Sequence, residues 1–184
     1  MKLSSISIIV SILFAPSFII ALQYFEFKSV TISYAILMFF YLLGMILLKQ
    51  DLKTIFAPII YFIFLILAYI LSSMEFVKII PALISAIFFL LFLTAYIQKK
   101  ELILSFTKKF YKKKLGEEEE RYIANGDGYW AIVTFINTSI QMVLAFFASD
   151  NIWAFYSSVG WYFYFFIALF FQIIYGKFYV SKGR

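Results

Sequence analysis

The chain contains no cysteine and no histidine among its 184 residues. Without cysteine it can form no disulfide, bind no metal through thiolates and use no cysteine nucleophile. Without histidine it also lacks the side chain that most often moves protons near neutral pH. Any catalysis would therefore depend on carboxylates, lysines or hydroxyls.

Charge is absent from most of the chain as well. All 16 basic and 10 acidic side chains lie outside six windows of 20 to 26 residues, which are Leu3–Phe25, Ser29–Leu48, Thr54–Met74, Ile79–Gln98, Gly128–Ser149 and Asn151–Gly176. About 20 helical residues cross a hydrocarbon core about 30 Å thick, so each window is long enough to span a membrane. With a hydrophobic content of 64%, this pattern excludes a soluble fold. It predicts an all-α integral membrane bundle of six transmembrane helices, forming one domain over residues 1–184.

The basic residues between the windows predict the orientation. If the N-terminus lies inside, 14 of the 16 Lys and Arg residues fall on the cytoplasmic side, and only Lys28 and Lys78 fall outside. Positive residues near span ends favour the cytoplasm, so we expect both termini inside a bacterial inner membrane. The outer connections, Glu26–Lys28, Glu75–Lys78 and Asp150, are too short for an external domain. The net charge of +6 follows this topology, and we predict no nucleic-acid partner.

Residues 99–127 form the one long polar segment, and its first half is basic. Leu102, Ile103, Phe106 and Phe110 share one helical face, which is typical of a helix that lies at the membrane surface. The segment either fixes the topology or contacts anionic lipid or a partner protein. For the second case the candidate residues are Phe106, Phe110, Lys108, Lys109, Lys112, Lys113 and Lys114.

The second half of this segment is acidic. Glu117–Glu120 form a run of four carboxylates, for which a solvated face is the default interpretation, and no calcium-loop pattern accompanies them. The following residues, Asn125-Gly126-Asp127-Gly128, predict a flexible turn before the fifth span.

Polar residues inside the fifth window follow a helical spacing. Thr134, Asn137, Thr138 and Gln141 recur at i, i+3, i+4 and i+7 and share one face. Amides are costly in hydrocarbon unless paired, so this face should point into the bundle. It is either interhelical hydrogen-bond glue or the wall of a ligand site. We expect its partners in the sixth window, at Ser157, Ser158, Trp161 and Gln172.

Three tryptophans lie in the last two windows. Trp130 and Trp153 lie near window ends, as expected for membrane-interface residues. Trp161 lies about 15 Å into its window, so its indole N–H needs an acceptor, which Thr138 or Gln141 would supply. The candidate ligand-binding set is therefore Thr134, Asn137, Thr138, Gln141, Trp161 and Gln172.

No catalytic site, metal site or cofactor is predicted. Every ionisable group lies at a window border, so a proton path through the bilayer is disfavoured. Glu75 and Asp150 would meet at the outer surface if the protein were an enzyme acting on a lipid head group.

Parts of the second half of the chain resemble a known family. The matching residues are Met74-Glu75 to Ile80-Pro81, Arg121-Tyr122, Trp130, Phe135, Asn137, Asn151-Ile152-Trp153-Ala154-Phe155-Tyr156 and Gly160, and the best stretch runs from Arg121 to Val180. It resembles small, uncharacterised bacterial inner-membrane proteins encoded near genes for aryl-polyene or fatty-acid-type lipid assembly, which are distantly similar to intracellular septation protein A. Ser157-Ser158 stands where that family tends to have Asn-Gly.

The resemblance implies a role in envelope or lipid assembly without an established reaction. We therefore expect a non-enzymatic accessory protein whose basic segment contacts anionic lipid or lipid-assembly enzymes. The alternative is a module that binds or transports a lipid or small hydrophobic molecule through the polar stripe of the fifth span. The sequence leaves the oligomeric state open.

Overall fold

The computed structural model describes residues 3–111 and 115–182, apart from the side chains of residues 3–12, 52–54, 57, 110, 180 and 182. Its elements are α1 (Leu3–Leu22), α2 (Phe27–Leu47), α3 (Leu52–Leu71), α4 (Met74–Ile97), α5 (Leu102–Phe110), α6 (Glu117–Ala124), α7 (Gly126–Phe147), α8 (Asp150–Phe155), the π-helical segment η1 (Tyr156–Gly160) and α9 (Trp161–Lys182). No strand occurs among the described residues, which confirms the all-α prediction.

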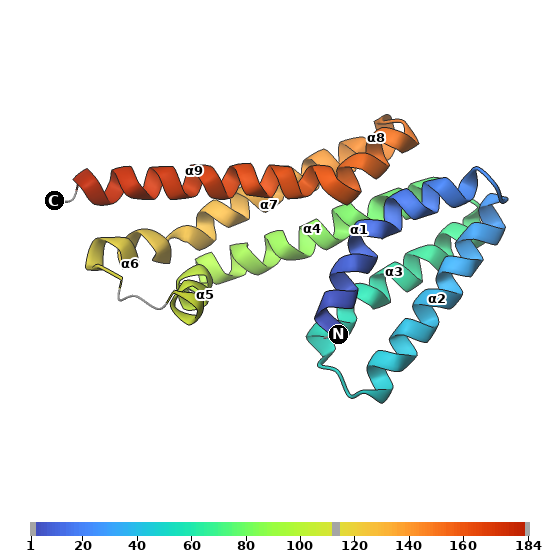
Figure 1. Cartoon of the computed structure of the whole chain (residues 1–184), viewed down its shortest axis with the longest axis horizontal. Helices are drawn as coiled ribbons and strands as arrows, with labels where there is room; N and C mark the ends of the chain where they lie inside the picture. The colour runs from blue at the N-terminus through green and yellow to red at the C-terminus, as the bar shows by residue number, and fades with distance from the viewer. Residues whose placement is uncertain (1–2, 112–114, 183–184) are drawn as a thin grey trace. The chain divides into compact units, whose positions relative to one another are not determined.

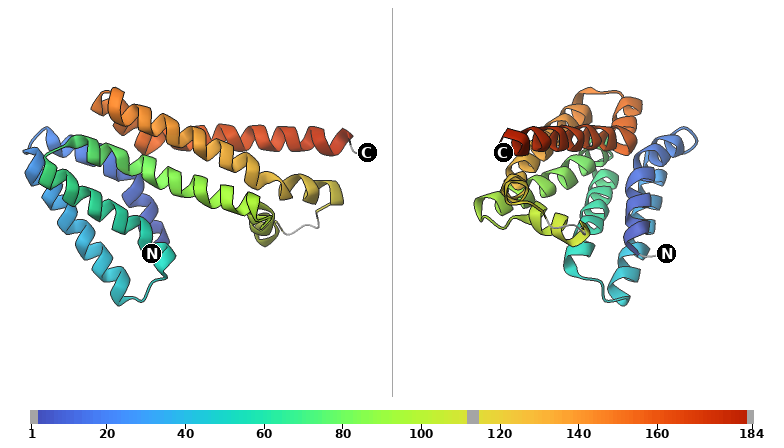
Figure 2. Two further views of the ribbon diagram at one scale, coloured as in Figure 1. Left: turned by 180° about the vertical axis from the view of Figure 1, so that it is seen from behind. Right: turned by 60° about the vertical axis from the view of Figure 1, so that its left-hand side comes forward.

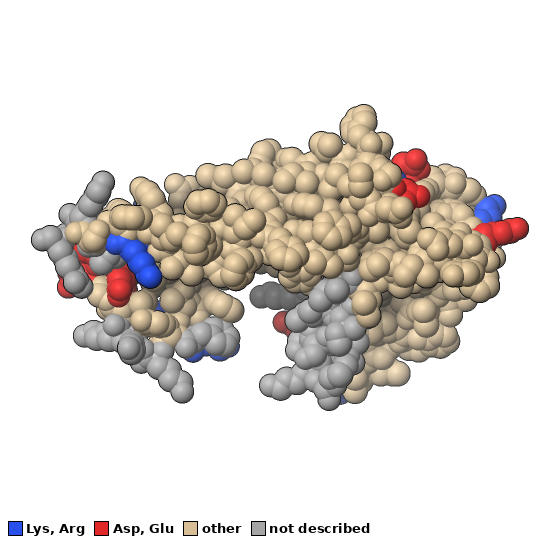
Figure 3. Space-filling model, turned by 45° about the horizontal axis from the view of Figure 1, so that its top comes forward, with Lys and Arg blue, Asp and Glu red and all other residues tan. Residues whose placement is uncertain are grey.

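Four helical stretches of the described chain are long and apolar enough to cross a membrane. They are Phe27–Leu47, Met74–Ile97, Glu117–Phe147 and Asp150–Tyr179, and shorter apolar stretches cover Leu13–Leu22 in α1 and Pro58–Leu71 in α3. Large apolar side chains such as Leu37, Phe40 and Phe166 are exposed. In Figure 3 most of the visible surface carries neither acidic nor basic side chains. These features are those of a multi-pass membrane protein, because a lipid phase covers such a surface without cost.

The chain folds into two compact units, to both of which α4 and α7 contribute. Unit 1 comprises the residues up to Ile84 and Gln141–Gly160, and unit 2 comprises Ser85–Ile140 and the residues from Trp161 on. In unit 1, α2 and α3 run side by side in opposite directions (Figures 1 and 2). Helix α1 contains Pro16, which lacks an amide N–H, and the helix changes direction along its length (Figure 1).

Aromatic side chains fill the core of unit 1. Phe14 of α1 packs edge-on against Tyr34 and Tyr61, with ring centroids 5.8 Å and 5.0 Å apart. Tyr34 donates a 2.7 Å hydrogen bond to the Ser17 hydroxyl, which satisfies its polar end within the core. Trp153 of α8 is completely buried in the same core. Its indole N–H donates to the Lys78 carbonyl at 3.0 Å, so the Trp153 side chain is enclosed by protein.

The connection between α3 and α4 is shorter than the charges indicate. Ser72 adopts a left-handed conformation with φ of 52°, which ends α3, and α4 begins at Met74. Glu75 and Lys78, expected in this connection, are therefore helical. Lys78 is only 9% exposed, and its Nζ lies 2.6 Å from Asp150 Oδ1 and 3.3 Å from the Ala148 carbonyl oxygen.

The sixth window is not one uniform α-helix. It is divided into α8, the π-helical η1 and α9, and the Ser158 hydroxyl in η1 donates to the Ala154 carbonyl at 2.7 Å. A wider π turn leaves carbonyls poorly paired, and a serine hydroxyl can satisfy one of them. This break separates Ser157 in unit 1 from Trp161 in unit 2.

In unit 2, tyrosine hydroxyls join α7 to α9. Tyr129 donates to the Ala168 carbonyl at 2.6 Å, and Tyr164 donates to the Val133 carbonyl at 2.9 Å. Helix α7 begins at Gly126, and no glycine among the described residues has a positive φ. The expected flexible turn at residues 125–128 is therefore a helix start instead.

Candidate functional site

The polar stripe of α7 is used in helix packing. Asn137 is 2% exposed, and its Nδ2 donates to Ser85 Oγ on α4 at 2.8 Å. Thr138 Oγ1 lies 3.0 Å from the same oxygen, and Ser85 Oγ lies 3.4 Å from the Thr134 carbonyl. These contacts all lie within unit 2 and satisfy the polar groups that we considered for a ligand site. The sequence analysis did not identify Ser85, whose hydroxyl is the common partner.

Gln141 forms a separate contact in unit 1. Its Oε1 accepts a 3.1 Å hydrogen bond from the Ser157 hydroxyl, and both residues are buried. Ser157 was one of the partners expected from the sixth window. Gln141 is thus paired within unit 1, whereas the other stripe residues are paired in unit 2.

Trp161 begins α9 and packs among aromatic rings. Its ring centroid lies 4.0 Å from that of Tyr162 and 5.6 Å from that of Phe165, and the residue is half-buried. The hydroxyl of Thr138 and Oε1 of Gln141, expected to accept from its indole, bind Ser85 and Ser157 respectively. Among the described residues, no hydrogen bond joins the Trp161 indole to either group.

Gln172 connects three helices of unit 2. Its Oε1 accepts a 2.9 Å hydrogen bond from Trp130 Nε1 of α7, and its backbone carbonyl accepts a 2.6 Å bond from the Tyr122 hydroxyl of α6. Close packing accompanies these bonds: a Cβ at Gly176 would lie 2.6 Å from Tyr122 Cε1, and one at Gly126 would lie 3.1 Å from Gln172 Nε2. Small residues are thus required where α6 and the start of α7 meet α9.

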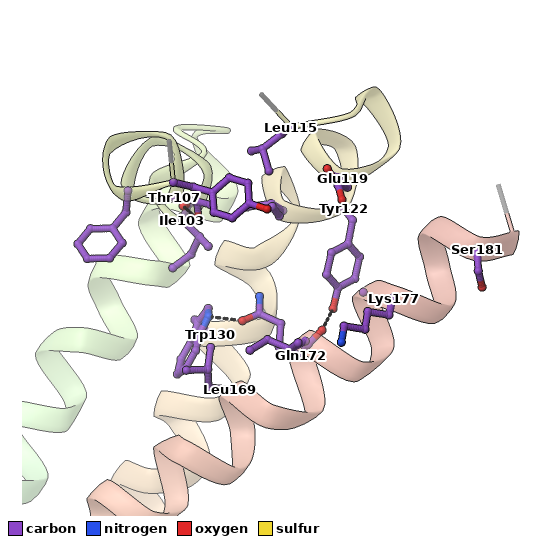
Figure 4. A pocket seen from close by; sticks show the side chains of 15 residues that line it. Ile103, Thr107, Leu115, Glu119, Tyr122, Trp130, Leu169, Gln172, Lys177 and Ser181 are labelled. Atoms are coloured by element: carbon purple, nitrogen blue, oxygen red, sulfur yellow. Dashed lines mark hydrogen bonds between the residues drawn. The ribbon is translucent and has the colours of Figure 1, made fainter. Parts of the chain in front are cut away.

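A cavity of about 770 Å³ opens beside Gln172. Its lining comes from four helices, α5, α6, α7 and α9, and from Tyr111 and Leu115. It comprises Ile103, Phe106, Thr107, Tyr111, Leu115, Glu119, Tyr122, Ile123, Trp130, Leu169, Gln172, Ile173, Gly176, Lys177 and Ser181 (Figure 4). The walls are mostly apolar, and a few polar groups lie among them. Such a composition and size are typical of small-molecule sites.

A buried carboxylate fixes α5 over this cavity. Asp127, in the first turn of α7, is 1% exposed and accepts hydrogen bonds from the backbone N–H groups of Leu102 and Ile103, at 2.8 Å and 2.9 Å. These are free N–H groups at the start of α5, so Asp127 caps that helix from a distance. Its role was missed because sequence alone places it among solvated carboxylates.

Helix α6 is held by two acidic side chains from the run at residues 117–120. Glu119 accepts a 2.8 Å bond from the Gly116 N–H, which stabilises the helix start, and Glu120 pairs with Lys108 of α5 at 2.9 Å. The acidic run therefore ties α6 to α5 in addition to facing solvent.

The basic segment is described only in part. Phe106 lines the cavity and Lys109 is exposed, while Lys112, Lys113, Lys114 and the Phe110 side chain lie outside the described residues. On α5, Leu104 is the buried residue instead of Phe106, which is 60% exposed. The apolar face of this helix is thus divided between packing at Leu104 and the cavity wall at Ile103 and Phe106.

The two carboxylates considered for an enzyme have different partners. Glu75 accepts a hydrogen bond from Ser73, whereas Asp150 pairs with Lys78. Across the described residues, no three His, Cys, Asp or Glu side chains lie close enough together to hold a metal ion.

In comparisons with protein-family models, curated proteins and solved structures, nothing matches this chain. The evidence for function is therefore the cavity and the groups around it. Of the six candidate ligand residues, Gln172 lines this cavity. Gly176, one helical turn after Gln172, is the sequence signal that would have indicated a close approach to another helix at this point.

Proposed function

We propose that the chain is a six-span protein of the bacterial inner membrane, with both termini and residues 99–127 in the cytoplasm. The lengths of α1 and α3, each 20 residues, support adding these helices to the four stretches described above. The distribution of 14 of the 16 basic residues supports the orientation.

We further propose that unit 2 binds one lipid or other hydrophobic molecule in the cavity beside Gln172. The observation that carries this proposal is a cavity of about 770 Å³ with mostly apolar walls and a fixed polar group, Gln172, at its edge. Pockets of about 300–1,000 Å³ bury most of a small ligand. For the polar residues of α7 we propose interhelical hydrogen bonding instead of ligand binding, since Asn137 and Thr138 are bonded to Ser85.

Binding from a membrane has a particular energetic requirement. An apolar chain gains little by leaving lipid tails for an apolar cavity, because both surroundings are equally free of water. The preference for one molecule must then come from shape and from polar contacts at the cavity edge. Fixed polar groups such as Gln172 are suited to this role.

We also propose that the protein acts in envelope or lipid assembly. The resemblance to proteins encoded near lipid-assembly genes supports an accessory role in envelope or lipid assembly. The basic segment, with Lys109 exposed, supports contact with anionic lipid or with a soluble lipid-assembly enzyme.

Native mass spectrometry of the gently purified full chain, with identification of bound molecules, tests cavity binding. We expect about one hydrophobic molecule per wild-type chain. Ile173→Trp places a larger side chain in the cavity wall, and an overpacking cost of about 1–3 kcal/mol should lower the affinity about 5- to 150-fold and so reduce occupancy.

The matched control is Ile167→Trp on the same helix. Ile167 is 53% exposed and Ile173 50%, but Ile167 does not line the cavity, so this variant should retain the bound molecule. Only bulk lipid on the wild type, or equal occupancy in both variants, would contradict the proposal.

A further inference from the structure

Gln172 presents a hydrogen-bond donor to the cavity. Because Trp130 Nε1 has only a proton to give, its 2.9 Å bond requires the oxygen of the Gln172 amide on that side. The Nε2 group is therefore directed away from Trp130, and Figure 4 shows it pointing into the cavity. Among the described residues it has no acceptor, so Nε2 can still donate to a ligand.

Lys177 adds a positive charge to the same cavity. It is exposed, lines the cavity five residues beyond Gln172 on α9, and forms no ion pair with any described carboxylate. The acidic residues of α6 have other partners: Glu118 lies 3.6 Å from Arg121, and Glu120 lies 2.9 Å from Lys108. Lys177 is therefore the cation of this cavity without a partner in the described chain.

Glu119 is the one carboxylate in the cavity lining, and its hydrogen bond is local. It accepts the Gly116 N–H and lies in the first turn of α6, where the helix dipole favours a negative group. The hydroxyls of Tyr122 and Thr107 donate to the carbonyls of Gln172 and Ile103. Ser181 donates to the Phe178 carbonyl. The lining donors without an acceptor among the described residues are thus Gln172 Nε2, Lys177 Nζ and the Tyr111 hydroxyl, and only Lys177 carries a charge.

We propose that the cavity binds a single-chain amphiphile through an anionic, acceptor-only head, a carboxylate or a phosphate, which Lys177 and Gln172 hold while the chain lies along the apolar walls. This inference rests on the proposed binding function and specifies its ligand class. An ammonium bonded to an anionic oxygen forms a charge-assisted hydrogen bond, about twice as strong as a neutral one. Such a contact supplies the selectivity that the apolar chain alone lacks in a membrane.

Competition binding on the full chain in lipid nanodiscs tests the head group. Labelled stearate is the probe at pH 8, and its binding to the Ile173→Trp variant is subtracted as non-specific background. The competitors are stearate, stearoyl lysophosphatidic acid, stearyl alcohol and stearylamine. In the wild type we expect stearate to compete at least about tenfold better than the alcohol or the amine. Lys177→Gln should reduce this ratio to near one, and Lys177→Arg should retain most of it.

Lys109→Gln is the charge-matched control, because Lys109 is exposed on α5 but does not line the cavity. It should leave the ratio unchanged. Better competition by stearate or by the lysophosphatidic acid than by the alcohol and the amine supports an anionic head. The stronger of the two anionic competitors shows whether the head is a carboxylate or a phosphate. Equal competition by alcohol or amine, or the same loss in Lys109→Gln, overturns the head assignment while cavity binding stands. If Ile173→Trp binds as much probe as the wild type, the proposed binding function fails as well.

Discussion

Asn137 and Ser85 show how a buried amide is accommodated in this protein. The amide donates to a serine hydroxyl on the neighbouring helix, and that hydroxyl also lies within hydrogen-bond distance of Thr138. Asp127 follows the same rule with a charge, since two backbone N–H groups of α5 bind its carboxylate. Burial of polar groups is tolerated in both places because the partners are fixed by helix packing.

Asn137→Ala should therefore reduce stability more than ligand binding. Removing the amide takes one of two donors from Ser85, and interhelical hydrogen bonds of this kind contribute about 0.6–2 kcal/mol. We expect a lower thermal midpoint with unchanged probe affinity, measured by thermal unfolding and by the stearate assay.

Ser139→Ala on the same helix is the control for this change. The Ser139 hydroxyl is exposed and bonds only to the Phe135 carbonyl of its own helix, so its loss should have little effect. If Asn137→Ala lowered probe affinity without changing stability, the polar residues of α7 would have to be part of the ligand site.

At the scale of elements, small residues determine how closely helices approach. Gly176 of α9 lies against the Tyr122 ring of α6, and Gly128 of α7 lies against the Tyr96 ring of α4. The Tyr122 hydroxyl then reaches the Gln172 carbonyl, which joins α6 to α9 at the cavity. The shape of the cavity thus depends on a glycine that contributes no side chain of its own.

Gly176→Ala tests this dependence. The new Cβ would lie 2.6 Å from Tyr122 Cε1, so the ring must move and its bond to Gln172 is weakened. We expect a loss of roughly 1–3 kcal/mol of stability and weaker probe binding.

Gly44→Ala in α2 is the matched substitution. Nothing lies within 4 Å of a Cβ at Gly44, so alanine there should be neutral or should stabilise the helix by up to about 1 kcal/mol. If both alanines change the thermal midpoint equally, the close contact at Tyr122 is not what matters at Gly176.

At the scale of the whole molecule, the proposed six-span topology places Lys28 outside and Lys109 inside. If only the four longer stretches crossed the membrane, α1 and α3 would not, and these two lysines would lie on the same side. The absence of native cysteine makes this measurable, because a single introduced cysteine is the only thiol.

We expect a membrane-impermeant maleimide to label Lys28→Cys in intact spheroplasts and Lys109→Cys in inverted vesicles. Both positions are exposed, so burial would not hide either thiol. Labelling of both in the same preparation would exclude the six-span arrangement.

The helical and membrane character of this protein could be predicted from sequence because both are local properties. A run of uncharged, apolar residues satisfies its backbone hydrogen bonds within one helix, whatever its neighbours are. The exceptions lie at helix ends. Helix α4 begins before Lys78, whose charge pairs with Asp150. The turn expected at Gly126 is instead the start of α7, where the Asp127 carboxylate accepts a hydrogen bond from the Leu102 N–H of α5.

The partners of the polar residues could be predicted only in part. Gln141 and Ser157 pair as the spacing in the last two windows indicated, whereas Asn137 pairs with Ser85 of α4. Partner choice depends on how each helix is rotated and shifted against its neighbours, and no periodicity within one helix encodes that.

By itself, the sequence determined that this is an all-helical protein with membrane-spanning stretches, because length, hydropathy and missing charge act residue by residue. Only the tertiary structure decided where its cavity lies. Residues from α5, α6, α7 and α9 form most of the lining, and Lys177 of α9 is its cation. Such a site depends on contacts between residues as far apart in the chain as Trp130 and Gln172, which form only when the helices pack.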